Sequence, residues 1–428
     1  MLDTLTRLLQ KVDERAAVHS TLNAYASGTQ ALTYLAPEIR TQLSNRLSRV
    51  AVNVPRLLVD SLVERLRVVG FEGVDVWTDW RRNGLVELAP VAHREALVLG
   101  DAFAIVWARP DGSPLVTIES SQQMAAEFDP ATRELVRAVK RWETPADGTH
   151  AVLYEADRIT HYRSQNPGAT TLGYRVVETI DNPLGVPPVV RFRNGGRLLD
   201  DDGVSEMADV LPLTDALVKL ATDMLTASEY GARPRRWATG LELAEDEDGN
   251  AVSPIAEGDR LMVNESPEGK FGQLPGSDLA AYENAIGVVM RLISAVSGLP
   301  EHLLGIGGDN PTSADSIRAS EAALTARAEA RQATFGGAWE DVARLMVGVR
   351  EGVDPASVDV AVKWADPSTR SAAQEADAVT KLYTAGLLPA SVALERLGYS
   401  DDEIVKIRDA RRAEALDGQG VDLNGLLS

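Results

Sequence analysis

The sequence predicts an α+β fold that is mainly helical, with a β-rich segment between two helical parts of the chain. Apolar residues recur at helical spacing before residue 100 and again from residue 204, whereas the segment 102–191 alternates apolar and polar residues. In the stretch from Gly298 to Val349, apolar or small residues recur near a seven-residue spacing over more than 30 residues. Such a length is unusual for a helix of a globular protein and is closer to an assembly element.

The first third of the chain opens with helices. Pro37 and Pro55 each fit a first helical turn, and a further helix is expected from Trp80 to Leu99. The apolar positions of the first helices are Leu43, Leu47, Val50, Leu58, Leu62 and Leu66. Strands are then expected at 102–108 and 115–119, separated by a Pro-Asp-Gly turn, with further strands to about residue 191.

The second half alternates long helices with a small β module. Helices are expected at 204–230, ending before Pro234, and at 277–296. Between them, residues 235–275 are strand-like, with the acidic run 245–250 at a hairpin tip. A strand at 358–364 and small helices follow, with Gly386 as a helix end and Ser400 opening a capping box.

A glycine pair lies inside the long helix. Each of Gly336 and Gly337 costs about 1 kcal/mol relative to alanine in a helix interior. The pair therefore predicts a kink or a break in the helix. The alternative is a long core helix that tolerates two glycines, and the pattern alone favours that alternative.

Composition excludes several classes of protein. The 428 residues carry a formal charge of −20, so bulk attraction to nucleic acid or to an anionic membrane is not expected. The chain has no cysteine, which excludes disulfides, thiolate metal sites and cysteine nucleophiles. The N-terminus lacks the apolar core of a signal peptide, and no apolar run is long enough for a transmembrane helix. A soluble protein made in a cytoplasm is expected.

Motifs for catalysis or cofactor binding are absent from the sequence. The five histidines include no pair three or four residues apart, and neither HExxH, GxxxxGK[ST] nor GxSxG occurs. An EF-hand aligned on Gly249 would place Ala244 first and Ile255 twelfth, where carboxylates are needed. No catalytic residue, metal ligand or cofactor is therefore predicted.

One group of basic residues beside a tryptophan is a candidate for contact with a phosphate backbone. It lies where the first long helix gives way to the β module, and a lysine lies near the other end of that module. The alternative is a solvated rim or a protein interface. The group comprises Arg233, Arg235, Arg236, Trp237 and Lys270.

Four segments, in this order, resemble the portal proteins of tailed bacteriophages, and most closely those of long-tailed phages. They are LGDAFAIVWARPDG (99–112), NPLGVPPVVRFRN (182–194), SGLPEHLLGIGGDNPTSADSIRASEAAL (297–324) and EADAVTKLYTAGLLPASVALERLGYS (375–400). The sequence of helix, small β module, helix, Gly-x-Pro turn, loop and long helix is similar to that family across nearly the whole chain.

The resemblance implies a domain organisation. Residues 1–203 would form a wing, 204–230 and 277–297 two stem helices, and 231–276 a clip. Residues 298–352 would supply a tunnel loop and a long kinked helix, and 353–428 a crown of small helices with a frayed end. Tunnel-loop candidates that would face DNA are Gly307, Gly308, Asp309, Asn310, Pro311 and Thr312.

The resemblance also implies a function without catalysis. The chain would form a ring, typically a dodecamer, at one capsid vertex of the virion, after assembly in the host cytoplasm. Double-stranded DNA would pass through the ring, and the implied partners are the terminase large subunit, a head-completion adaptor, and the major capsid and scaffolding proteins. An acidic channel wall would keep the DNA mobile. The alternatives are a soluble hydrolase that uses dispersed carboxylates, and another head–tail connector protein.

Overall fold

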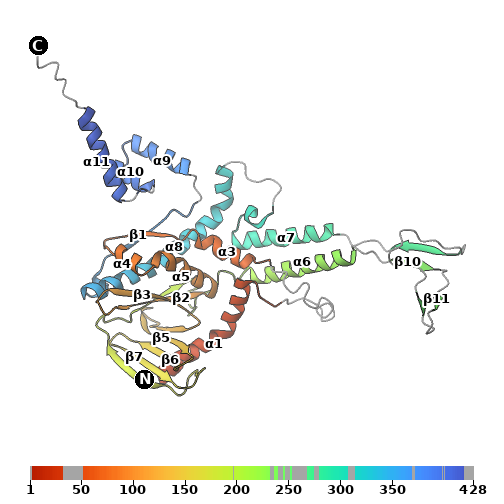
Figure 1. The fold of residues 1–428 in the computed structure, drawn as a ribbon, viewed down its shortest axis with the longest axis horizontal. Helices are drawn as coiled ribbons and strands as arrows, with labels where there is room; N and C mark the ends of the chain where they lie inside the picture. The colour runs from red at the N-terminus through yellow and green to blue at the C-terminus, as the bar shows by residue number, and fades with distance from the viewer. Residues whose placement is uncertain are drawn as a thin grey trace, which may run out of the picture. The chain divides into compact units, whose positions relative to one another are not determined.

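The computed structural model has the α+β composition predicted from the sequence (Figure 1). It describes residues 2–31, 52–195, 197–231, 236–239, 244–245, 251–252, 268–273, 279–306, 314–368, 372–397, 399 and 401–418. Two compact units are present, one of Met1–Asn310 with Ala322–Pro367 and a smaller one of Pro311–Glu321 with Ser368–Ser428.

The elements follow one another as helices, then strands, then helices with short strands between them. The helices are α1 (Leu2–Ser27), α3 (Val54–Val63), α4 (Trp77–Arg82), α5 (Leu85–Leu99), α6 (Leu211–Gly231), α7 (Ala280–Ser297), η1 (Glu301–Leu304), α8 (Ala314–Glu351), η2 (Pro355–Ser357), α9 (Ala372–Thr384), α10 (Ala390–Arg396) and α11 (Asp401–Gly418). The strands are β1 (Val68–Glu72), β2 (Asp101–Ala108), β3 (Pro114–Ser120), β4 (Met124–Phe128), β5 (Leu135–Thr144), β6 (Gly148–Tyr154), β7 (Arg158–Ser164), β8 (Arg175–Asp181), β9 (Val189–Arg193), β10 (Arg236–Thr239), β11 (Ala244–Glu245), β12 (Ala251–Val252), β13 (Lys270–Gln273) and β14 (Ala361–Trp364).

Helix α3 confirms the helical start expected at Pro55. The Asn53 side chain accepts a hydrogen bond from Arg56 N at 3.1 Å, and Pro55 occupies the first turn, where its missing N–H costs nothing. Leu58, Leu62 and Leu66 are fully buried in the main core. The expectations for Pro37, Leu43, Leu47 and Val50 lie outside the described residues.

The prediction of one helix from Trp80 to Leu99 is wrong, because the stretch is divided between two helices, α4 and α5. Gly84 separates them with a φ of 65°, a conformation that glycine adopts without steric cost. The buried Asn83 side chain donates to the carbonyl oxygens of Asp79 and Pro114 and accepts from Val116 N at 3.0 Å. These bonds hold the break against strand β3.

Two antiparallel sheets form the β-rich part predicted between residues 102 and 191. One has the order β3-β2-β9 and the other β4-β5-β6-β7-β8. Helix α5 packs on the first sheet, and α1 packs on the second through Leu5, Leu8, Leu9 and Val12. The two sheets share a small core at one side, made of Phe103, Ile105, Met124, Ala126, Ala138 and Val189.

Helix α6 begins at Leu211 rather than at 204. Residues 204–210 instead form turns held by backbone bonds, because Glu206 N donates to Leu97 O at 2.8 Å and Val204 N to Asn194 O at 2.9 Å. The expected β module is present as two antiparallel pairs, β10 with β13 and β11 with β12. Glu245 pairs with Ala251, whereas the acidic run 246–250 and Pro234 lie outside the described residues.

Helix α8 is continuous from Ala314 to Glu351, so the glycine pair does not break it. A Cβ at Gly336 would lie 3.2 Å from Val362 Cγ1 and 3.3 Å from Trp364 Nε1, whereas nothing lies within 4 Å of a Cβ at Gly337. Gly336 therefore allows strand β14 to approach the helix closely. The kink at this pair stays a prediction.

Strand β14 pairs with β1 near the start of the chain, which the sequence did not indicate. Its range, Ala361–Trp364, confirms the last part of the strand expected at 358–364. In the smaller unit, Gly386 follows α9 with a φ of 72°, as expected for a helix end, and the short helices bury Val379, Ala393 and Ile404. Ser400 lies outside the described residues, so its capping box stays a prediction.

Candidate channel and assembly elements

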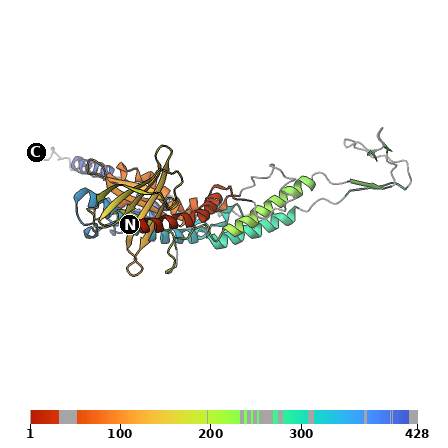
Figure 2. The same ribbon diagram turned by 90° about the horizontal axis from the view of Figure 1, so that it is seen from below.

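Helices α6 and α7, here called the stem, lie side by side and are joined through the β10–β13 segment (Figures 1 and 2). The inner side of α6 buries Leu217, Val218 and Ala221, and α7 contributes the fully buried Ile293. Tyr25 of α1 donates a hydrogen bond to the Asp215 carboxylate at 2.8 Å, which ties the base of α6 to the N-terminal helix. The stem is thus anchored to the main core at one end.

The outward side of α7 carries an apolar stripe that the described chain leaves about half exposed. Val288, Leu292 and Val296 are spaced four residues apart and are 49%, 48% and 38% exposed. Residues at this spacing lie on one helix face. A surface helix of a monomer ordinarily places polar residues on such a face, so the stripe is typical of an interface.

A buried carboxylate, Glu206, joins both stem helices to the long helix α8. Its side chain is 3% exposed and accepts from Arg327 Nη1 at 3.2 Å and from Arg331 Nη2 at 2.6 Å. Arg327 also donates to the carbonyl oxygen of Val296, at the end of α7, at 2.6 Å. We call this group the Glu206 clamp. It connects the segment before α6, the end of α7 and the middle of α8.

The turn after α7 is shaped to meet the Glu206 clamp. Gly298 has a φ of 72°, and a Cβ there would lie 3.1 Å from Arg327 Nε. Ser294 donates its hydroxyl to Leu299 O at 2.7 Å, which closes the turn. The clamp was missed by sequence reasoning, although arginines four residues apart on one helix, such as Arg327 and Arg331, are a pattern that indicates a shared acidic partner.

The predicted tunnel-loop residues Gly307, Gly308, Asp309, Asn310, Pro311 and Thr312 all lie outside the described residues. The described chain stops at Ile306, just after the 3₁₀ turn η1, and resumes at the start of α8.

The structure brings together only part of the predicted basic group. Trp237 on β10 is 45% exposed and lies opposite Gly272 of β13, where any Cβ would overlap its indole ring. Lys270 is exposed and is opposite Thr239 in the same ribbon, and Arg236 begins strand β10. Arg233 and Arg235 lie outside the described residues. Contact of this group with a partner stays a prediction.

The stem helices have a weakly acidic composition, with Asp215, Asp223, Glu229 and Glu283 against Lys219 and Arg291. Lys219 forms an ion pair with Asp223 one turn away. Because this pair neutralises Lys219, little positive charge remains along these helices to bind a phosphate backbone.

The described histidines and carboxylates were predicted to form no metal site, and their surroundings are as follows. No group of three or more His, Asp or Glu residues in the described part of the chain could hold a metal ion. His150 and His161 are hydrogen-bonded through Nδ1 and Nε2 at 3.0 Å and stack on Trp142, and burial together with His150 lowers the pKa of His161. His93 is fully buried, and burial lowers its pKa to about 3. None of the helices described is long and apolar enough to cross a bilayer.

The paired helical stem, the small β module and the long clamped helix follow one another in the order that the sequence resemblance implies for a structural portal subunit. The chain belongs to the phage portal protein family of the SPP1 Gp6-like type, whose family model matches residues 17–416. This confirms the resemblance found in the sequence, and the family is one of structural proteins.

Two curated relatives agree with the family assignment. The portal protein of Mycobacterium phage D29 is 33% identical over 402 residues, covering 86% of this chain and 80% of the relative. The portal protein of Mycobacterium phage L5 is 32% identical over 398 residues, with the same coverage. The chain is therefore similar to mycobacteriophage portal proteins over most of its length.

The chain also matches chains in solved structures of gene transfer agent particles. A chain in the structure titled virion of the native gene transfer agent (GTA) particle matches with a TM-score of 0.48 and 16% sequence identity. The match covers 84% of this chain and 92% of that chain. The neck of the native GTA particle, computed with C12 symmetry, matches with a TM-score of 0.47 and 14% identity over 89% and 99%.

Proposed function

We propose that this chain is the subunit of a closed portal ring that serves as the channel for viral DNA during packaging and ejection. The ring, typically a dodecamer, would occupy one capsid vertex, dock the terminase large subunit and later hold a head-completion adaptor. Major capsid and scaffolding proteins would surround it during assembly in the host cytoplasm. The family assignment supports this role, and the half-exposed apolar stripe on α7 is the observation that carries the ring.

The stripe supports a ring because its three apolar residues need a partner. An α-helix stripe of this kind is stabilised by burial at about 25 cal/mol per Å² of apolar surface. A neighbouring stem helix would cover it, and repeating that contact around an axis closes a ring with a central hole. The anchored base of the stem, fixed by Asp215 and the Glu206 clamp, holds each stripe in a defined direction.

The charge balance of the stem supports passage rather than capture of DNA. Duplex DNA carries one negative charge per roughly 1.7 Å of axis, so a basic wall would hold it through many phosphate contacts. The stem has more carboxylates than basic residues, and the whole chain carries −20. The tunnel loop of 307–312 would be the part that approaches the DNA, and Arg233, Arg235, Arg236, Trp237 and Lys270 would meet partners at the clip.

Of the alternatives, another head–tail connector protein would share the ring but not the terminase contact. A soluble hydrolase with dispersed carboxylates has no specific observation in its favour. Translocation itself would be driven by the terminase, in agreement with the missing GxxxxGK[ST] motif.

Electron microscopy of the purified full chain in negative stain tests the ring. Wild-type protein should show rings with a central hole, and Leu292→Asp should shift the protein to smaller species, because a charge on the stripe would be desolvated at the interface. Val18→Asp is the matched control, since Val18 is 60% exposed on α1, outside the stem. A compact monomer for the wild type, or equal rings for both variants, would contradict the proposal.

A further inference from the structure

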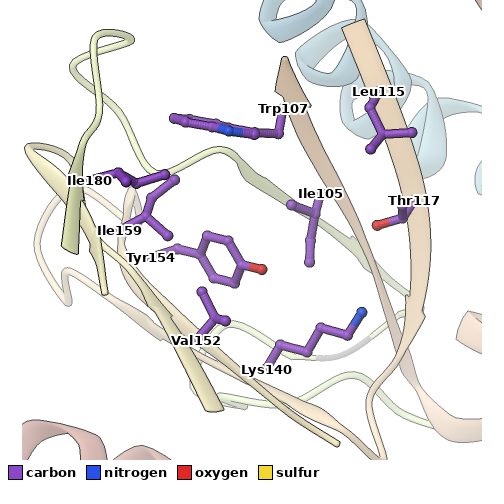
Figure 3. Close-up of a pocket in the computed structure, with 9 residues that line it drawn as sticks. All are labelled: Ile105, Trp107, Leu115, Thr117, Lys140, Val152, Tyr154, Ile159 and Ile180. Carbon is purple, nitrogen blue, oxygen red and sulfur yellow. The ribbon is translucent and has the colours of Figure 1, made fainter. Parts of the chain in front are cut away.

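A cavity of about 250 Å³ opens between the two sheets of the main unit (Figure 3). The sheets are closed at one side by their shared core and separate at the other, where side chains from both point toward one another. The lining is mainly apolar and includes Ile105 and Trp107 of β2, Leu115 of β3, Tyr154 of β6, Ile159 of β7 and Ile180 of β8.

The cavity offers an apolar surface without a free charge. Lys140 Nζ at its wall is 2.6 Å from Glu119 Oε1, and Thr117 Oγ1 donates to the same oxygen at 2.8 Å. The ammonium is therefore already neutralised and is not available for an anion. Since a dry cavity of about 150 Å³ holds benzene, this one has room for one or two leucine-sized side chains.

The rim of the cavity is an exposed edge strand. Strand β8 is the last strand of the five-stranded sheet, and all seven of its residues are exposed. Val176, Val177 and Ile180 are 56%, 56% and 37% exposed. Arg175, Glu178 and Asp181 protect this edge against pairing with another strand, so the surface that a partner can cover is the apolar part of the rim beside the cavity.

The same chain carries a fitting apolar projection. Leu198 and Leu199, in the loop after β9, are 86% and 90% exposed. The loop is held in place, because Arg133 donates to Leu198 O at 2.9 Å and Arg193 to Asp200 O at 2.5 Å. Arg197 N also donates to the Asp200 carboxylate at 2.7 Å. The leucines thus stand on a fixed loop, which lowers the entropic cost of inserting them into a partner.

The projection and the cavity lie at opposite edges of the two-sheet unit. The projection follows β9 and is bonded to Arg133 in the β4–β5 hairpin, and β9 and β4 are edge strands of their sheets. The cavity lies toward the other two edge strands, β3 and β8, which supply Leu115 and Ile180. A projection on one edge and a cavity on the other produce a head-to-tail contact, which is the geometry that closes rings.

We infer that Leu198 and Leu199 of one copy insert into the cavity beside Ile180 of the next copy, and so lock neighbouring wings together. This inference rests on the proposed ring, to which it adds a second interface away from the stem. A second copy is the occupant that the placement favours, since the fixed loop cannot cross its own sheets to reach the cavity. The leucines would bury against Trp107, Tyr154 and Ile180.

Site-directed cross-linking tests this contact without background, because the chain has no cysteine. A double variant, Leu199→Cys with Ile180→Cys, is assembled and treated with a short bis-maleimide. Linked oligomers should form a ladder up to the full ring in denaturing gels. The matched control replaces Leu199→Cys by Leu172→Cys, because Leu172 is likewise exposed, at 80%, in a different loop. It should give no ladder.

A second variant, Leu198→Asp with Leu199→Asp, checks the energetic contribution. Both leucines are exposed in the single chain, so the monomer should fold with an unchanged melting temperature, while the ring should dissociate at a protein concentration at least tenfold higher than wild type. Rings that form normally but give no ladder, and that the aspartates leave unchanged, would overturn this contact and leave the portal function standing. A wild-type chain that forms no ring, together with a double-cysteine variant that gives no linked oligomers, would overturn both.

Discussion

The protonation of His93 provides the sharpest test of the packing between α5 and α8. His93 is fully buried and stacks on Phe335, with ring centroids 5.3 Å apart and planes 3° apart. Its Nε2 accepts the indole N–H of Trp339 at 2.8 Å. An indole nitrogen only donates, so a protonated imidazole would point one N–H at another. Together with burial, this keeps His93 neutral in the folded protein.

The magnitude follows from the difference in pKa between the folded and unfolded chain. Burial lowers the pKa of His93 from 6.5 to about 3. The unfolded chain therefore binds the proton first as the pH falls, and stability is lost between pH 6.5 and about 3 at roughly 1.4 kcal/mol per pH unit. Between pH 7.5 and pH 5, His93 should account for a loss of about 2 kcal/mol in the free energy of unfolding.

The perturbation that isolates this effect is His93→Gln, measured by urea unfolding at pH 7.5 and pH 5 at one protein concentration. Glutamine can accept the Trp339 N–H but does not titrate and does not stack. The variant should be less stable at pH 7.5 by about 1–3 kcal/mol, yet its loss on acidification should be smaller than that of wild type by about 2 kcal/mol. If both proteins lose the same free energy, the buried neutral imidazole is not linked to folding and the reasoning is refuted.

Four further substitutions test packing at named positions, three of them by thermal unfolding and the fourth by tryptophan fluorescence. Gly337→Ala should stabilise α8 by about 0.5–1 kcal/mol, whereas Gly336→Ala should gain less or destabilise, because its Cβ meets strand β14; the reverse order would contradict this. Glu206→Gln should cost about 3 kcal/mol, because two arginines lose a buried partner, and a cost under about 1 kcal/mol would show the clamp is dispensable. Gly272→Ala should displace the Trp237 indole and so change the wavelength of maximum tryptophan emission. An unchanged emission spectrum would contradict the cross-strand contact.

Local sequence patterns were sufficient to predict the elements that neighbouring residues in the chain determine. Pro55 after Asn53 marks the start of α3, and alternation from 102 to 119 marks β2 and β3. They were insufficient at Asn83–Gly84, where a helix of the right periodicity is broken by side-chain bonds to β3. The start of α6 was misplaced for the same reason, because the turns at 204–210 are held by contacts with Leu97 and Asn194.

Some parts of the candidate channel and assembly elements could likewise be predicted from the sequence, and others could not. The stem helices and the small β module could be predicted from periodicity, and the family from four ordered segments. The Glu206 clamp could not, because Arg327 and Arg331 lie more than a hundred residues away from Glu206 in the chain. The tunnel-loop residues and most of the basic group stay predictions, and they are the positions at which the DNA and partner contacts are to be tested.

The sequence by itself determined the α+β class, the order of its long helices, the absence of cysteine chemistry and the portal family. These depend on residue type and spacing, which are properties of the chain. The tertiary structure alone decided that Gly336 lies under β14, that Glu206 joins the stem to α8, and that Leu198 and the cavity lie at opposite edges of the sheets. Such relations depend on long-range packing, where the burial of one side chain is set by residues far away in sequence.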